Sequence, residues 1–219
     1  MAVTLDAIGV ALTTGSVTSA SYTGITVGSG PFRGLVIFLS TNTAITTPSI
    51  TWDSGGTNQA MTQVVSANNA GAENVWVFVL RSPTSGNKTA LVSWTTAAVV
   101  SIEAISFTQV LQTTVLTAFP NANNNSGTST SATLAITSAA GNMPVMIVNT
   151  ANSVTLSAPT QSPIYTSNAT VIAGAQFANG IATTNFAWTL SGSVGWVTAG
   201  VDVAAAPPPT LIFSIINVG

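Results

Sequence analysis

Short apolar runs separated by turn-forming residues are the feature of this sequence that most constrains its fold. Residues 35–39 and 75–80 form two of the longest runs, and clusters of glycine, proline, asparagine and serine separate such runs along the chain. Runs of this length are typical of strands, and no segment has the 3.6-residue period of an amphipathic helix. Turn signals recur at intervals of about 8–12 residues, which predicts a β-sandwich or a barrel.

We therefore predict an all-β fold, a single two-sheet β-sandwich of jelly-roll type. Strands are predicted at 3–10, 19–27, 34–40, 49–52, 59–67, 73–81, 88–94, 99–107, 133–137, 145–149, 153–156, 170–177, 185–190, 194–203 and 210–218. The Asn/Ser/Thr-rich stretch 121–131 is predicted to be a loop.

The predicted organisation is one sandwich domain over residues 1–206, followed by a proline-rich spacer and a terminal strand over residues 207–219. A split into two domains near 121–131 is the alternative. It is disfavoured because neither half has a self-contained pattern of terminal strands, and no internal repeat is evident.

Charge is scarce: 4% of the residues are charged, against about 25% in ordinary proteins. Arg33, Arg81 and Lys88 are all the basic residues, which is too few for nucleic acid. Hydroxyls and amides must then hydrate the surface. A coat of this kind costs little to desolvate, so we expect it to be covered by neighbouring subunits. A free monomer with a threonine-rich coat is the alternative.

Apolar runs of a few residues are too short for a membrane-spanning helix, which needs about 20. Residues 1–6 have no basic region and no long apolar stretch of the kind that a secretory signal requires. We therefore expect no membrane partner and assembly in a host cytoplasm.

Catalytic chemistry has few residues to use. Histidine and cysteine are absent, which excludes Ser-His-Asp and Cys-His arrangements and the usual zinc ligands. Asp53 and Glu73 are the one carboxylate pair considered for glycoside hydrolysis, and Asp53 with loop carbonyls for Ca²⁺. The simpler interpretation is that Asp53 stabilises a turn and Glu73 a strand end. We predict no enzyme, no catalytic or metal site and no cofactor.

Aromatic side chains offer a second kind of site, because tryptophan can stack on sugar rings. Most of the five tryptophans lie in apolar strands, where burial is the usual outcome. Trp196, between Gly195 and Val197 after a glycine-containing turn, is expected to be the most exposed. A carbohydrate-binding module is therefore the alternative function.

The segment 210–218 is strongly apolar and follows Pro207, Pro208 and Pro209. An exposed edge of this kind aggregates unless it is paired. Pairing beside the N-terminal strand of its own sandwich is favoured, since domain termini are often adjacent. Strand addition to another chain stays open.

Residues 50–114 carry a recognisable pattern: ITWDSGGTNQAMTQVVSANNAGAENVWVFVLRSPTSGNKTALVSWTTAAVVSIEAISFTQVLQTT. The pattern begins with a glycine-rich turn, an Ala-Met-Thr strand and an Asn/Gly loop. It continues with an aromatic strand, a Val-Ser-Trp strand and a closing Phe-Thr-Gln-Val-Leu, and 129–142 fits as a later turn. This resembles a β-sandwich domain of phage particle proteins and large secreted bacterial proteins. The resemblance implies a jelly-roll or lectin-like sandwich for display, adhesion or assembly, with no functional residues to transfer. Trp52 and Asp53 make the first turn longer than the pattern expects.

Together these observations predict a non-catalytic virion structural protein of a bacteriophage. It would be a capsid decoration protein or a head or tail fibre subunit, a homo-oligomer in contact with other virion proteins. The alternative is an adhesin or receptor-binding module whose partner is a cell-surface glycan.

Overall fold

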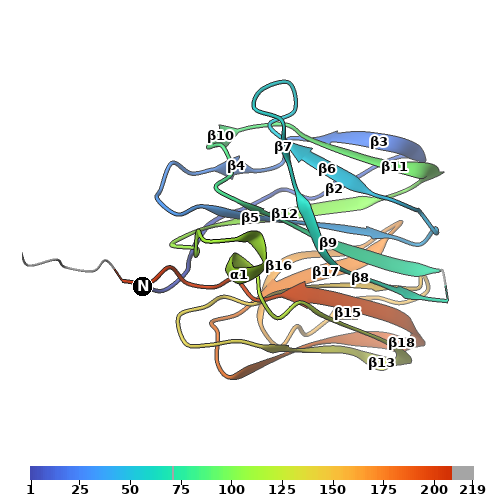
Figure 1. The fold of residues 1–219 in the computed structure, drawn as a ribbon. Helices are drawn as coiled ribbons and strands as arrows, with labels where there is room; N and C mark the ends of the chain where they lie inside the picture. The colour runs from blue at the N-terminus through green and yellow to red at the C-terminus, as the bar shows by residue number, and fades with distance from the viewer. Residues whose placement is uncertain (71, 209–219) are drawn as a thin grey trace, which may run out of the picture.

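The fold is that of a computed structural model, which describes residues 1–70 and 72–208. Three extended β-sheets lie one above another, and Figure 1 shows them as an upper, a central and a lower layer. The all-β sandwich is thus confirmed, with more sheets than the two predicted. The predicted terminal strand 210–218 lies outside the described residues, and the domain boundary after residue 206 stays a prediction.

The central sheet has the strand order β1-β12-β5-β9-β8, with β2 paired to β12, and its pairings are antiparallel. Leu35, Ile37 and Leu39 point to one face, Val36 and Phe38 to the other, and all five are fully buried. The predicted strand 34–40 is thus confirmed, and it is buried on both faces. The strands are β1 (Thr4–Ile8), β2 (Leu12–Thr13), β5 (Gly34–Thr41), β8 (Thr62–Asn69), β9 (Glu73–Arg81) and β12 (Ser101–Thr108).

The upper sheet has the order β3-β11-β6-β7, and a two-stranded ribbon of β10 and β4 lies beside it. Alternate residues such as Ile50, Trp52 and Val92 face the central sheet and are buried, because one face of the sheet is covered and the other is not. The strands are β3 (Val17–Tyr22), β4 (Thr26–Val27), β6 (Ser49–Trp52), β7 (Gln59–Ala60), β10 (Gly86–Asn87) and β11 (Ala90–Ala98).

The lower sheet has the order β13-β18-β14-β17-β16, with β15 paired to β18. Its two longest strands, β13 and β18, pair along almost their whole length, with a register shift between Ser129 and Ser131. The strands are β13 (Asn123–Thr137), β14 (Val145–Thr150), β15 (Leu156–Ser157), β16 (Ser162–Asn168), β17 (Ile172–Phe177) and β18 (Thr183–Val201).

Three apolar cores hold these layers together. The first lies between the upper and central sheets, and the second between the central and lower sheets. The third is made almost wholly of residues of the lower sheet and the loops that border it, including Leu134, Phe186 and Trp188. A sheet can enclose a core of its own only if it doubles over, so β13 and β18 each contribute to two layers.

Two local predictions are wrong. The stretch 121–131 is not a loop, because 123–131 forms the first half of β13. Pairing with β18 supplies its backbone hydrogen bonds, and this long-range pairing overrides its polar composition. The predicted strands 185–190 and 194–203 form the single strand β18, so the turn expected around Gly192 is a bend within a strand.

Four elements were not anticipated, namely the short strands β2 and β10, the strand β16 and the helix α1. β16 (Ser162–Asn168) contains Pro163 and lies at the edge of its sheet, where a missing N–H is tolerated. The one-turn helix α1 (Val115–Ala118) is capped by Thr114, whose hydroxyl accepts from the Thr117 backbone amide at 3.2 Å. No helix in the described part of the chain is long and apolar enough to cross a membrane.

Candidate functional site

The two carboxylates considered for glycoside hydrolysis lie far apart. Glu73 begins β9, whereas Asp53 accepts a hydrogen bond at 3.2 Å from Thr84, which follows the other end of that strand. From Glu73 to Arg81 the strand β9 rises by eight residue steps, which is about 26 Å at 3.3 Å per step. Glycosidase pairs are separated by about 5–10 Å. The structure therefore does not bring Asp53 and Glu73 together.

Asp53 instead organises the turn after β6. Its carboxylate accepts from the Thr57 amide at 3.1 Å, the Thr57 hydroxyl at 2.8 Å and the Thr84 hydroxyl, and Lys88 lies 3.4 Å away. The amide and hydroxyl of Thr57, with help from Thr84 and Lys88, hold the pKa of Asp53 below its usual range. These contacts give Asp53 a structural role in the turn.

A groove in the surface of the lower sheet is lined by neutral side chains. Across the described ranges, no three or more Asp, Glu, His or Cys residues group where they could hold a metal. The groove has a volume of about 400 Å³, with Asn125, Thr133, Thr160 and Asn185 as its polar lining. Side-chain amides and the hydroxyls of threonine do not titrate near neutral pH, so this lining offers no general acid or base.

Trp196 is buried, so the expectation that it is exposed is wrong. Its side chain is 5% exposed, and its indole N–H donates to the Ser129 hydroxyl at 3.0 Å. The bend of β13 creates this environment, since Gly127 lies against the ring, where a methyl group would approach to 2.9 Å. The expectation that the other tryptophans are in the core is confirmed for Trp52, Trp76, Trp94 and Trp188.

The main finding concerns charge. All eight charged residues lie in the described ranges, and four of them are buried, while the other four are only partly exposed. The buried ones are Asp53, Glu73, Glu103 and Asp202, and the half-buried ones are Asp6, Arg33, Arg81 and Lys88. The surface is therefore formed by neutral side chains, mainly serine, threonine and asparagine on strands such as β3 and β13.

Glu103 is the most deeply buried of the acids. It lies on β12, is 1% exposed, and accepts a hydrogen bond from the Ser101 hydroxyl at 2.7 Å, while its second oxygen has no partner among the described residues. Burial raises the pKa of Glu103 to about 8, and the Ser101 hydrogen bond offsets only part of this effect. The carboxyl is thus mostly protonated at neutral pH.

Asp202 is the second buried acid with a raised pKa. Burial is the main cause, and hydrogen bonds from the Ser138 hydroxyl at 2.8 Å and the Asn142 amide at 2.6 Å act in the opposite direction. These contacts join the end of β18 to the turn before β14. Both acids are enclosed by structure, and neither lines the groove described above.

The outermost strands of the sheets are protected without charge. Exposed edges in proteins are usually blunted by lysine, proline or bulges, because a free edge recruits other chains. Here the outermost strands carry a single charged residue, Asp6, which accepts from Gly28 and Ser106 within the chain. All five register shifts among the described strands fall in pairings that include an outermost strand. In β1, β8 and β16 the extra residue lies on the edge strand itself and interrupts that edge.

Asparagine side chains give the edge strand β13 further protection. Asn121, Asn123 and Asn125 donate to the backbone carbonyls of Thr137, Ala135 and Thr133 at 2.9, 2.9 and 3.2 Å. The two halves of the doubled strand thus lie side by side, and side-chain amides occupy carbonyls that could otherwise accept from another chain. We call these three residues the asparagine ladder.

Comparison with known proteins adds no assignment. No protein-family model matches the chain, and the search of curated proteins finds no match. The resemblance of residues 50–114 to phage and secreted β-sandwich domains therefore stays a prediction.

Proposed function

We propose that this chain is a non-catalytic structural protein that assembles through contacts between protein surfaces. The observation that carries the proposal is the scarcity of charge at the surface, since four of the eight charged residues are buried and the other four are only partly exposed. Charged groups are depleted at the centres of protein interfaces because they are costly to desolvate. A surface of hydroxyls, amides and methyl groups can be covered by a neighbour at low cost.

The bulged, amide-covered edges fit the same function. An assembling protein needs defined contacts, and interrupted edges disfavour the open-ended strand pairing that leads to aggregates. We infer that the neutral faces of the sheets and their loops make the contacts.

The more specific proposal is a bacteriophage virion protein, either a capsid decoration protein or a head or tail fibre subunit, acting as a homo-oligomer. It is supported by the neutral surface and by the strand and turn pattern of residues 50–114. The alternative, a carbohydrate-binding module, has no tryptophan with which to stack on a sugar, because all five are buried.

Mass measurement in solution tests the proposal. The purified chain is expected to form an oligomer at micromolar concentration, or to join capsid or tail proteins of a phage particle when mixed with them. Replacing Ser19 and Ser21, on the outer strand of the upper sheet, by lysine puts charge on the neutral surface. If this face makes contacts, the double variant should associate more weakly than wild type. A chain that stays single up to millimolar concentration, and binds no virion protein, would overturn the proposal.

A further inference from the structure

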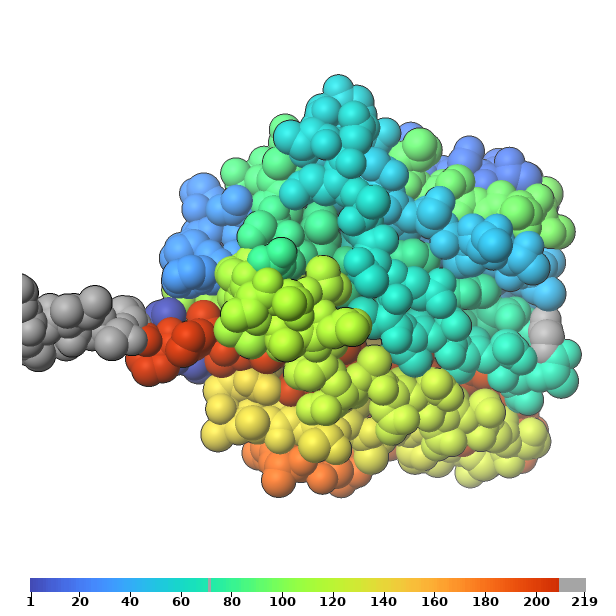
Figure 2. All heavy atoms as spheres, in the orientation of Figure 1, coloured from blue at the N-terminus to red at the C-terminus, as the bar shows by residue number. Residues whose placement is uncertain are grey.

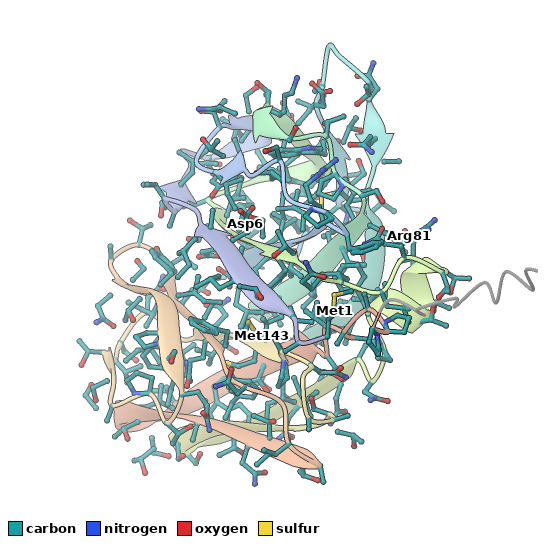
Figure 3. The ribbon with its side chains drawn as sticks, turned by 90° about the vertical axis from the view of Figure 1, so that its left-hand side faces the viewer. Met1, Asp6, Arg81 and Met143 are labelled. Atoms are coloured by element: carbon teal, nitrogen blue, oxygen red, sulfur yellow. The ribbon has the colours of Figure 1, made fainter. Side chains whose placement is uncertain are left out.

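Both ends of the described chain meet at one side of the molecule. The Met1 amino group donates to the Ala206 carbonyl at 3.1 Å, and the Ala206 amide donates to the Gln109 carbonyl at 2.7 Å. The Ala204 amide reaches the Ala118 carbonyl of α1 at 2.9 Å. Figure 3 shows this side facing the viewer, with Met1 near the middle and Arg81 beside α1.

Three large apolar side chains are exposed at this side: Met1 at 39%, Phe32 at 46% and Leu116 at 70%. The Phe32 carbonyl accepts from the Val110 amide at 2.8 Å, and Val110 forms a β-bridge with Ala205. Leu116 lies on α1. We call Met1, Phe32 and Leu116 the exit surface, because the chain leaves the sandwich between them. In Figure 2 the red end of the described chain adjoins the blue N-terminus and the yellow-green α1 region.

The charged groups near the exit surface are engaged in hydrogen bonds, and the Met1 amino group is one of them. The Arg33 guanidinium donates to the carbonyls of Pro83 and Gly30 at 2.9 Å each, and Arg81 donates to the Gln112 carbonyl. The Gln112 side chain donates in turn to the Arg33 carbonyl at 3.0 Å. Both guanidinium groups are thus engaged by backbone oxygens beneath the apolar side chains.

Phe32 has a backbone φ of 54°, in the left-handed region that disfavours bulky residues. Glycine would relieve this strain, and the exposed ring gains little burial within its own chain. Strained positions that persist in a fold often mark functional contacts. The strained and exposed ring of Phe32 is therefore a candidate for contact with a partner.

We propose that residues 210–218 of a second copy of this chain cover the exit surface. The segment begins two residues after the last described residue, Pro208, so it starts close to this surface, and its apolar residues are Leu211, Ile212, Phe213, Ile215, Ile216 and Val218. Burying these residues against the exit surface would remove apolar area of both partners from water. This inference rests on the proposed function, because it names the surface through which copies assemble.

The three prolines direct the segment to another copy. Ala206, Pro207 and Pro208 each precede a proline, which favours extended backbone. A run of three prolines in a sequence favours an extended spacer. For residues 210–218 to cover the exit surface of their own chain, the chain would have to turn back close to Ala206, and the prolines that follow Ala206 disfavour such a turn. A neighbouring copy meets no such restriction.

Variants of the full chain test the inference. Leu116→Asp alters the surface, Phe213→Asp alters the segment, and Ile181→Asp is a matched control at a residue that is 61% exposed between β17 and β18. We expect wild type and the control to self-associate equally by light scattering, and each of the other two to dissociate at least tenfold more readily. Phe32→Gly should weaken association, while the melting temperature of this variant stays equal to that of wild type or rises. An unchanged or higher melting temperature shows that the weaker association comes from a lost contact and not from misfolding.

A mixing experiment decides between two copies and one. The Leu116→Asp chain keeps an intact segment, and the Phe213→Asp chain keeps an intact surface, so an equal mixture should form dimers that neither forms alone. If both variants associate like wild type, the exit surface is wrong and the proposed function is unaffected. If wild type stays single yet joins capsid or tail proteins, the second copy is wrong and the proposed function stands. If wild type stays single and binds no virion protein, both fail.

Discussion

Replacing Glu103 by glutamine should make the stability of the fold less dependent on pH. The folded protein holds the proton of Glu103 up to a pKa of about 8, whereas the unfolded chain releases it near the ordinary value of 4.5. Between these values the folded state binds more protons than the unfolded state, so stability is complete below pH 4.5 and falls as pH rises toward 8.

The magnitude follows from the width of this window. Each pH unit between the two pKa values costs about 1.4 kcal/mol of unfolding free energy, so Glu103 alone lowers stability by about 3 kcal/mol at pH 7 and about 4 kcal/mol at pH 8. Domains of this kind have total stabilities of about 5–15 kcal/mol, so the effect is large. Glutamine has nearly the same shape, stays neutral, and should remove the contribution of Glu103 to the slope.

Urea unfolding followed by tryptophan fluorescence measures the effect at pH 5, 6, 7 and 8. The wild-type midpoint should fall across this range and that of Glu103→Gln should fall less, because Asp202, whose pKa is also raised, remains in both proteins. Ser101→Ala, which removes the hydrogen bond that lowers the pKa of Glu103, should extend the wild-type decline to higher pH. Parallel slopes for wild type and Glu103→Gln would refute the assignment of a buried, protonated acid.

Three further predictions concern the lower sheet and the turn after β6. Gly127→Ala should destabilise the fold by about 1–3 kcal/mol, measured by thermal unfolding, because its methyl group would press on the Trp196 ring at 2.9 Å; an unchanged melting temperature would contradict this packing. Replacing Asn123 and Asn125 by alanine should leave far-UV circular dichroism unchanged but speed aggregation in light scattering, since two edge carbonyls lose their donors. Equal aggregation rates for the variant and wild type would show that the asparagine ladder does not protect the edge. Asp53→Asn should lower stability at pH 7 and flatten its decline below pH 4, because the depressed pKa of Asp53 contributes stability that is present above its ordinary pKa and lost in acid; matching acid profiles would argue against this role.

Much of the fold can be read from local pattern. The strands at 49–52 and 73–81 begin and end where they were predicted, because apolar content and flanking turn residues define them. The polar strand β13 could not be found in this way, since an Asn/Ser/Thr stretch becomes a strand only when β18 pairs with it. The exit surface was also missed. Phe32, Leu116 and Met1 are far apart in sequence, and no local signal marks an apolar residue that folding leaves exposed.

The sequence by itself determined the class of the fold and the neutrality of the surface. The spacing of apolar residues favours strands through neighbours that are close in sequence. Only eight of the 219 residues are charged, so most of the surface has to be neutral. Only the tertiary structure decided that half of those charged residues are buried, that Trp196 is enclosed by a doubled sheet, and that Glu103 keeps its proton near neutrality. The reason is physical: burial, pairing and pKa depend on which distant segments meet, and most contacts of a stacked-sheet protein join residues that are remote in the chain.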